Sequence, residues 1–198
     1  LIPTPIGNLD DLTLRAIECI KDVDLILCED TRRSLKLLNH LQIKKPLKSF
    51  HKFNEHSKVE KVIIEIQSGT KVGLISDAGT PSISDPGYLI VKMCIDNNID
   101  VECLPGPTAL IPALAISGLP SDRFTFEGFL PVKKGRKTRL QELSLEKRTM
   151  IFYESPYKLY KTLKDFYYYF GPDREISISK ELTKIFENTK RGKIKDII

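Results

Sequence analysis

The sequence predicts an α/β protein built around a mainly parallel sheet, followed by a second, smaller α/β domain. Two observations indicate this class. Short apolar runs alternate along the chain with stretches of helical spacing, which is the pattern of repeated βα units. The run Val72-Gly73-Leu74-Ile75 is apolar throughout, as strands are when a parallel sheet is covered on both faces.

The first part of the chain contains three predicted strands and four predicted helices. Apolar runs predict strands at 23–28, 72–75 and 101–104. Apolar spacing of i, i+3, i+4 and i+7 predicts a helix at Val59–Ile66, and similar spacing predicts helices around 35–41, 89–94 and 108–116. The helix at 108–116 is apolar almost all round, so we expect burial on most sides, either within the monomer or in a dimer interface.

The second part repeats the alternation on a smaller scale. We expect strands at Phe124–Phe129, 150–153 and 175–179, a helix at 159–170, and a basic loop at 133–137. Ser117-Gly118-Leu119-Pro120-Ser121-Asp122 has the composition of a linker. The predicted domains are therefore 1–118 and 119–198.

Both ends of the sequence indicate that the chain is a piece of a longer protein. Leu1-Ile2 is too short for a strand, so we expect the first strand of domain 1–118 to begin upstream. The chain stops at Ile198 inside what reads as a starting helix, so we expect domain 119–198 to continue.

Composition indicates a globular protein of the cytoplasm. Hydrophobic residues make up 41% and charged residues 29% of the chain, and no apolar run is long enough to span a membrane. Four cysteines, without a C-x-x-C pair, read as reduced core thiols and not as metal ligands: Cys19, Cys28, Cys94 and Cys103. We expect no metal.

Positive charge is concentrated in the second domain. Residues 130–198 carry 17 Lys+Arg against 9 Asp+Glu, although the whole chain has a net charge of only +5. Such a distribution is typical of proteins that bind an anionic partner, most commonly nucleic acid. A solvated lysine-rich surface explains the composition equally well.

The loop at 76–87 is the most informative segment. It follows the strand at 72–75 and is about twice as long as the usual strand-to-helix connection. Its glycines and small residues allow backbone to approach a ligand closely. We expect Asp85 to cap the next helix and Pro86 to occupy the first helical position, and we expect Asp77 to face a pocket.

Four loops follow strands and are expected to lie at one edge of the sheet, where α/β proteins bind ligands: 4–8, 29–32, 76–87 and 105–109. They contain neither G-x-G-x-x-G nor a P-loop motif, and they hold few cations apart from Arg32 and Arg33. The loops therefore favour a cofactor with an adenosine and a cationic centre over a polyphosphate.

These motifs resemble a known family. Thr-Pro-Ile-Gly-Asn-Leu-x-Asp, Glu-Asp-Thr-Arg, Ser-Asp-Ala-Gly-Thr-Pro-x-Ile-Ser-Asp-Pro-Gly and Pro-Gly-Pro-Thr-Ala are similar to the tetrapyrrole-methylase-like S-adenosylmethionine methyltransferases. The segments at 128–131, 153–156 and 180–184 resemble its bacterial branch, which methylates a cytidine ribose 2′-hydroxyl in small-subunit (16S) ribosomal RNA.

The resemblance implies two α/β domains of the tetrapyrrole methylase type, with S-adenosylmethionine in the cleft between them, and a homodimer. It implies these donor-binding residues: Pro5, Asp77, Ala78, Gly79, Thr80, Ile83, Thr108, Ala109 and Tyr153. A porphyrinoid carbon is the alternative methyl acceptor, although it would need no basic surface of this size. A nucleic-acid-binding module without chemistry is a third possibility.

Catalytic and RNA-binding residues are expected at two further places. Glu29, Asp30 and Arg32 lie after a strand, where they can take up a proton or hold a phosphate, or form a structural capping network. The cluster of Lys133, Lys134, Arg136 and Lys137 is expected to contact RNA. The run 167–170 is divided between core and surface, and stacking on bases is the less favoured interpretation.

Overall fold

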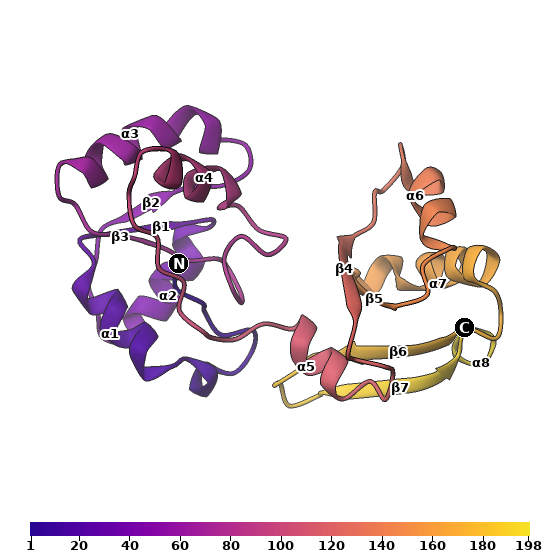
Figure 1. Cartoon of the computed structure of the whole chain (residues 1–198). Coiled ribbons are helices and arrows are strands. Elements are labelled where there is room, and N and C mark those ends of the chain that lie inside the picture. The colour runs from indigo at the N-terminus through magenta and orange to yellow at the C-terminus, as the bar shows by residue number, and fades with distance from the viewer. The chain divides into compact units, whose positions relative to one another are not determined.

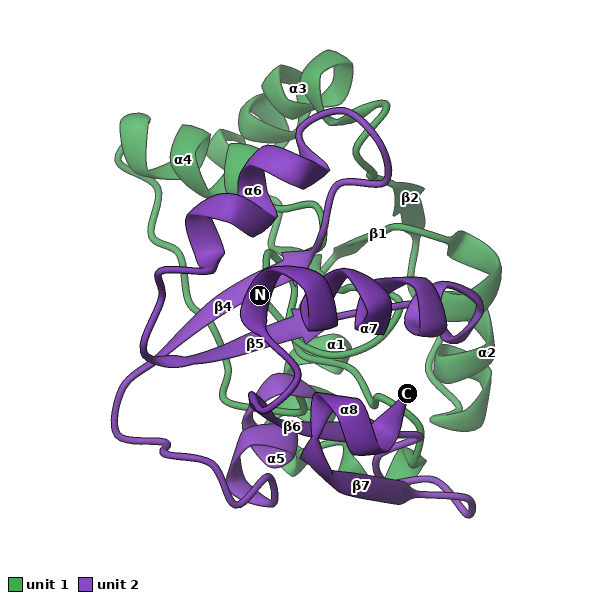
Figure 2. Ribbon diagram, turned by 90° about the vertical axis from the view of Figure 1, so that its right-hand side faces the viewer, with its two compact units in different colours: residues 1–108 green, residues 109–198 purple.

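The computed structural model describes residues 1–198 as two compact units, Leu1–Thr108 and Ala109–Ile198 (Figures 1 and 2). We call them unit 1 and unit 2. The linker composition of 117–122 predicts a domain boundary after residue 118, about ten residues after the boundary between the two units. The predicted domain boundary stays a prediction. None of the helices combines the length and the apolarity that a membrane span requires.

Unit 1 is built on a three-stranded parallel sheet in the order β2-β1-β3. β1 (Leu25–Cys28) lies in the centre, between β2 (Leu47–Ser49) and β3 (Val72–Leu74). In the register, Ile26 lies opposite both Leu47 of β2 and Gly73 of β3. All three strands run in one direction, which confirms the predicted mainly parallel α/β class.

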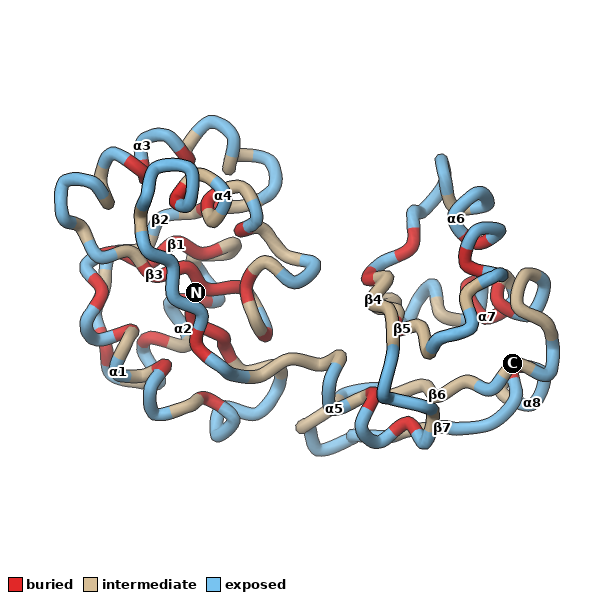
Figure 3. The backbone as a smooth tube through the Cα atoms, viewed as in Figure 1, coloured by how far each residue is buried: buried red, intermediate tan, exposed pale blue.

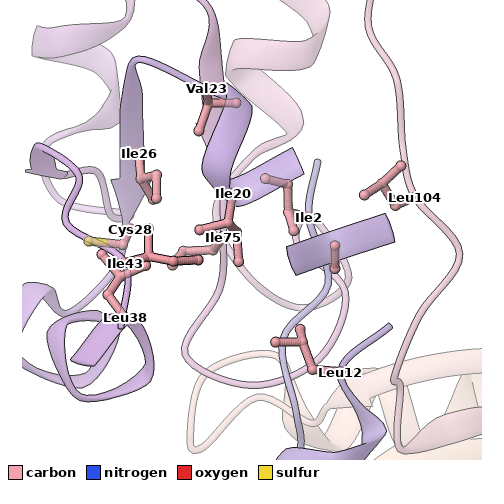
Figure 4. Packing of buried hydrophobic residues seen from close by; sticks show 11 residues of the cluster. Ile2, Leu12, Ile20, Val23, Ile26, Cys28, Leu38, Ile43, Ile75 and Leu104 are labelled. Carbon is pink, nitrogen blue, oxygen red and sulfur yellow. The ribbon is translucent and has the colours of Figure 1, made fainter. Parts of the chain in front are cut away.

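Helices cover both faces of this sheet (Figure 1). Leu25 and Leu27 belong to the core shared with α3 (Glu55–Gln67) and α4 (Tyr88–Asp96). Ile26 and Cys28 point the other way, into the core that holds residues of α1 (Leu14–Asp22) and α2 (Thr31–His40), as Figure 4 shows. The alternation of side chains along a strand therefore gives unit 1 its three layers.

Side-chain caps fix where two of these helices begin. Thr13 accepts a hydrogen bond from the backbone N–H of Ala16 at the start of α1. Asp30 accepts one from the N–H of Arg32 at 2.9 Å and starts α2 directly after β1. Each cap satisfies an N–H group that the first helical turn leaves unpaired, so the Glu29–Arg32 segment is held at the end of the strand.

Four expectations for unit 1 are wrong. Residues 101–104 form no strand, because their backbone pairs with Leu1 alone: the Leu1 amino group donates to the carbonyl oxygen of Glu102 at 2.6 Å, and the N–H of Leu104 donates to the carbonyl oxygen of Leu1 at 3.1 Å. Cys103 is exposed, not a core thiol, since it lies in this edge segment, whereas Cys28 and Cys94 are buried. Asp85 does not cap α4 and Pro86 is not its first residue, because that helix begins at Tyr88 with Gly87 as its N-cap.

Unit 2 contains a parallel pair of strands, an antiparallel pair and four helices. β4 (Phe124–Phe129) pairs with β5 (Thr149–Tyr153), and β6 (Glu175–Lys180) pairs with β7 (Asn188–Lys193). The helices are α5 (Leu110–Ala115), α6 (Arg136–Leu143), α7 (Pro156–Phe170) and α8 (Ile194–Ile197). The predicted strands at 124–129, 150–153 and 175–179 and the helix at 159–170 are confirmed.

The expected basic loop at 133–137 is only partly a loop, since α6 begins at Arg136. The core of unit 2 comes from α6, α7 and α8 and includes Leu140, Leu163, Phe166 and Ile194. α5 is less buried than its apolar sequence predicts: Ile111 is 48% and Ile116 38% exposed, and only Leu114 of this helix is buried (Figure 3).

Candidate functional site

Four loops of unit 1 meet at the carboxyl end of its sheet, as the sequence predicts. Thr4 and Gly79 form an antiparallel bridge, in which each backbone N–H donates to the other residue's carbonyl oxygen at 2.9 Å. The hydroxyl of Thr80 donates to the carbonyl oxygen of Pro107 at 3.0 Å. The N–H of Asp30 donates to Asp77 Oδ1 at 3.2 Å. The 76–87 loop thus contacts each of the other three.

Gly79 is the point at which the 76–87 loop turns. Its φ of +91° lies in the left-handed region, which favours glycine. The hydroxyl of Ser76 donates to the carbonyl oxygen of Gly79 at 2.9 Å, and the hydroxyl of Thr4 donates to the carbonyl oxygen of Ser76 at 3.1 Å. Because Thr4 and Ser76 are both buried, these bonds hold the backbone of the turn in one conformation.

Close packing also fixes the loop at 105–108. A Cβ on Gly106 would lie 2.5 Å from the Cβ of Pro3, so only glycine allows the two loops to approach this closely. Glycine at position 106 is therefore a packing requirement of the site.

Asp77 joins two of the four loops through both of its carboxylate oxygens. Oδ1 accepts the N–H of Asp30, and Oδ2 lies 3.3 Å from a guanidinium nitrogen of Arg33 on α2. The side chain of Asp77 is 22% exposed. Asp77 lines the pocket described below, and its role in binding a ligand stays a prediction.

Asp30 and Arg32 form an ion pair at the start of α2. Arg32 Nε and a terminal nitrogen lie 3.1 and 2.7 Å from the two oxygens of Asp30. Hydrogen bonds from the side chain and the backbone of Arg32 lower the pKa of the Asp30 carboxyl to about 2. Asp30 therefore stays ionised at neutral pH, as a capping residue does.

Asp85 has the opposite environment. Burial, reinforced by the charges of Glu29 and Asp77, raises the pKa of the Asp85 carboxyl to about 6, although Lys52 acts in the other direction. Three carboxyl groups from two loops thus interact at this end of the sheet. Their mutual repulsion would be relieved by a cation.

A surface pocket of about 230 Å³ lies beside the Thr4–Gly79 bridge. Its lining includes Thr4, Pro5, Ser76 and Asp77 from the loops. The α2 side of the pocket is formed by Arg33, Ser34, Lys36, Leu37 and His40. From the sequence, only Arg33 of these α2 residues was expected near the ligand-binding loops, and the other four were missed. Their recurrence at every third or fourth position after the capping residue Asp30 is the signal that could have found them.

The predicted donor-binding residues are divided between the two units. Pro5, Asp77, Gly79 and Thr80 lie in the loops that meet in unit 1, as do Ala78, Ile83 and Thr108. Ala109 and Tyr153 belong to unit 2. Tyr153 ends β5, where its ring packs against Phe126 and Phe129 with centroid distances of 5.1 and 5.6 Å.

The basic cluster of unit 2 contains residues in two different environments. Lys133, Lys134 and Lys137 are exposed. The side chain of Arg136 is only 11% exposed, and it donates to Asp165 Oδ2 at 2.8 Å and to the Thr162 hydroxyl at 2.7 Å. Arg136 is therefore held inside unit 2 by its own partners.

Glu154 extends the network around Arg136. It accepts a hydrogen bond from the Thr162 hydroxyl at 2.6 Å and one from the backbone N–H of Ser155 at 2.7 Å. The buried hydroxyl of Thr162 thus links Glu154 to Arg136. The Tyr-Glu-Ser-Pro motif consequently orients the start of α7 and the start of α6 together.

Comparisons with known proteins place these features in context. Residues 1–198 match the family described as Tetrapyrrole (Corrin/Porphyrin) Methylases. A Thermotoga maritima protein named Ribosomal RNA small subunit methyltransferase I is 46% identical over 100% of this chain and 89% of its own length. A Synechocystis protein of the same name is 48% identical, with 100% and 71% covered.

Solved structures share the fold at low sequence identity. The methyltransferase CobJ has a TM-score of 0.70 at 17% identity, covering 98% of this chain and 85% of its own. A uroporphyrin-III C-methyltransferase from Thermus thermophilus, complexed with S-adenyl homocysteine, has a TM-score of 0.65 at 16% identity, covering 99% and 88%. These two structures show what fold the chain adopts.

Proposed function

The chain belongs to the tetrapyrrole methylase family, and from this premise we propose that it is an S-adenosylmethionine-dependent methyltransferase of small-subunit ribosomal RNA. The proposed acceptor is the ribose 2′-hydroxyl of a cytidine. The observation that carries the proposal is the 46 to 48% identity, over the whole chain, to relatives named for this RNA. An RNA of this kind also implies the cytoplasm as the compartment.

The residues of unit 1 fit a donor that carries positive charge. Burial, together with the charges of Glu29 and Asp77, raises the pKa of the Asp85 carboxyl, so a sulfonium or ammonium group nearby would stabilise its ionised form. Gly79 and Gly106 bring backbone close together without side chains in between. When bound, S-adenosylmethionine supplies an electrophilic methyl group.

We assign the donor-binding role to the residues named from the sequence, with Pro5, Asp77, Gly79 and Thr80 as the best-supported members. Asp77, Gly79 and Thr80 take part in the hydrogen bonds that fix the four loops, and Pro5 and Asp77 line the pocket. Ala109 and Tyr153 remain predictions, because they belong to unit 2.

The chain must align the acceptor hydroxyl and receive its proton. We propose Glu29 as the proton acceptor, because Asp30 is already paired with Arg32 and has a pKa of about 2. In this proposal Glu29, Asp30 and Arg32 each have a different role. Asp30 holds Arg32 in place, and Arg32, whose side chain is 88% exposed, binds a phosphate of the RNA.

RNA binding is proposed for the exposed lysines Lys133, Lys134 and Lys137. Their support is their exposure and the excess of positive charge in residues 130–198. Arg136, which the sequence groups with them, is the least suited member, since its guanidinium is bonded to Asp165 and Thr162.

A homodimer is the proposed assembly. Ile111, which lies in α5, and Ile116, which is the C-cap of this helix, are both exposed in the single chain. A second copy of the chain that covered them would bury apolar surface. Light scattering at micromolar concentration tests the dimer, and a monomeric mass would contradict it.

A comparison of three methyl acceptors tests the proposed function. The protein is incubated with methyl-labelled S-adenosylmethionine and one of three acceptors: 30S subunits from cells that lack the gene, protein-free 16S ribosomal RNA, or uroporphyrinogen III. We expect label in the ribosomal RNA and none in the porphyrinogen. Label in the porphyrinogen alone would support the porphyrinoid alternative.

A further inference from the structure

The outward side of α7 carries tyrosines and lysines in a regular stripe. Tyr157, Lys161, Lys164 and Tyr168 follow one another at spacings of four, three and four residues, so they share one side of the helix. Tyr160 lies next to this stripe. We call these five residues the α7 outer face; from Tyr157 to Tyr168 it extends about 16 Å, at 1.5 Å per residue.

The opposite side of the same helix fills the core of unit 2. Leu163 and Phe166 are buried, and Leu159 and Phe170 pack against the same cluster. The core side and the outer face therefore lie about half a turn apart. The run Tyr167-Tyr168-Tyr169-Phe170 is divided between them, as the sequence predicts: Tyr169 packs against the core, and Tyr168 is 80% exposed.

The exposure of the three tyrosines on the outer face is unusually high. Tyr157 is 98%, Tyr160 58% and Tyr168 80% exposed. Most exposed apolar residues are isolated, whereas these three rings lie along one side of a single helix, and exposed aromatic side chains that share a face indicate an interaction site.

The charges on the α7 outer face indicate which class of partner it would bind. Lys161 and Lys164 lie between the tyrosines, and Lys164 Nζ lies 4.4 Å from the centre of the Tyr160 ring. The one acid of α7, Asp165, is bonded to Arg136. The outer face is therefore cationic as well as aromatic. Protein–protein interfaces are depleted in lysine, whereas nucleic-acid surfaces combine cations for phosphates with rings for bases.

We propose that the α7 outer face binds unpaired nucleotides of ribosomal RNA, with tyrosine rings stacking on bases and Lys161 and Lys164 contacting phosphates. The inference rests on the proposed function, which supplies the RNA, and adds a surface and a mode of binding. Unpaired nucleotides are specified because a base must leave its duplex partners before its flat side meets an aromatic ring.

Two double variants separate the two kinds of contact. Lys161→Gln with Lys164→Gln removes two cations, and Tyr157→Ala with Tyr168→Ala removes two rings. The side chains are exposed, so both proteins should fold. Tyr88→Ala with Lys61→Gln is the matched control, since Tyr88 is 74% exposed on α4 and Lys61 is exposed on α3, both in unit 1.

The measurement is affinity for protein-free 16S ribosomal RNA over a series of salt concentrations. The lysine variant should bind more weakly, and its slope of log affinity against log salt should be shallower by about 1.4 for single-stranded contacts. The tyrosine variant should lose roughly fivefold or more in affinity with its slope unchanged, since stacking releases no counterions. The control should match the wild type.

Three results would overturn the proposal. If both variants bind the RNA as the wild type does, while the wild type methylates ribosomal RNA, the surface is wrong and the proposed function stands. If the wild type neither binds nor methylates ribosomal RNA, both are wrong. Light scattering is measured on every variant. A tyrosine variant that changes from dimer to monomer with unchanged RNA affinity identifies the face as a protein interface instead.

Discussion

Thr4 and Gly79 are 75 positions apart in the sequence and form a two-hydrogen-bond bridge, with both N···O distances at 2.9 Å. The bridge fastens the first loop of the chain to the 76–87 loop. Because the φ of Gly79 is +91°, the geometry of the bridge depends on a residue without a side chain. The proposed donor site is therefore built on backbone, and it should be sensitive to substitutions that disturb backbone.

Gly79→Ala should lower both stability and donor affinity. A Cβ would meet Ile6 and the Pro107 carbonyl oxygen at 3.4 and 3.6 Å, which are ordinary contacts, so the cost comes from the left-handed backbone, about 1–2 kcal/mol. Gly69→Ala is the matched control, since Gly69 has a φ of +98° and nothing within 4 Å of the added Cβ. Calorimetry with S-adenosylmethionine should show weaker binding for Gly79→Ala only.

The larger Gly79→Val should reduce donor affinity more than Asp77→Asn does. Asparagine keeps an oxygen that can accept the N–H of Asp30 and loses only the ion pair with the exposed Arg33, a pair worth at most about 1 kcal/mol. Unchanged donor affinity in Gly79→Val would contradict the proposed placement of the donor.

The stability of the protein should depend on Asp85 as pH changes. The folded-state pKa of about 6 lies above the ordinary value of 3.8, so the protonated carboxyl is favoured in the folded protein. Its stabilising effect is complete below about pH 4 and is lost as pH rises through 6. Asp85→Asn should therefore be more stable than the wild type at pH 7.5, by about 1 kcal/mol after allowance for partial exposure.

Denaturant unfolding at pH 4 and pH 7.5 measures this difference. The advantage of Asp85→Asn should disappear at pH 4. Asp100→Asn, at an exposed position, provides the control and should show no advantage at either pH. A difference between wild type and Asp85→Asn that is the same at both pH values would refute the assignment.

Arg136→Ala should destabilise unit 2. The change removes the bonds to Asp165 and Thr162 and leaves their polar groups without this partner, at a cost of roughly 2–4 kcal/mol. Lys137→Ala, one residue along α6 and exposed, should stay within about 0.5 kcal/mol of the wild type. Thermal unfolding distinguishes the two. Equal melting temperatures would show that the network contributes little.

Glu29→Gln should slow methylation without loss of donor affinity. A positioned proton acceptor contributes about 10²- to 10⁴-fold to rate, so single-turnover methylation should slow by that range. Asp30→Asn and Arg32→Ala should have smaller effects on the rate, since their proposed roles are support and phosphate binding. Glu60→Gln, exposed on α3, is the control. Near-normal rates in Glu29→Gln, Asp30→Asn and Arg32→Ala would leave alignment as the source of catalysis.

The helices and strands that could be predicted from the sequence are those whose apolar residues follow a helical spacing or form a continuous run. The Val59–Ile66 spacing and the apolar run at 72–75 correspond to α3 and β3. By contrast, β7 has the sequence Asn-Thr-Lys-Arg-Gly-Lys and is mostly exposed. It is a strand because it pairs with β6 over six positions, and pairing between strands cannot be read from polar residues alone.

Within the site, the sequence predicted which loops meet but not which partners their side chains take. The positions of loops 4–8, 29–32 and 76–87 after strands were sufficient to predict a common edge. Whether a carboxylate caps a helix depends on the residue at which the helix begins, and α4 begins two residues later than the Asp-Pro-Gly sequence suggests. Burial of Arg136 likewise depends on Asp165 and Thr162, which are 29 and 26 positions away.

The most direct measurement of the central claim is the position of the methyl group on the RNA. The protein is incubated with S-adenosylmethionine and 30S subunits from cells that lack the gene, and the 16S ribosomal RNA is digested to nucleosides and fragments for mass spectrometry. We predict one added methyl group, on the ribose of a cytidine, and this nucleotide resists alkaline cleavage at its 3′ side. A methyl group on a base, or subunits that remain unmethylated while a porphyrinoid carbon is methylated, would contradict it.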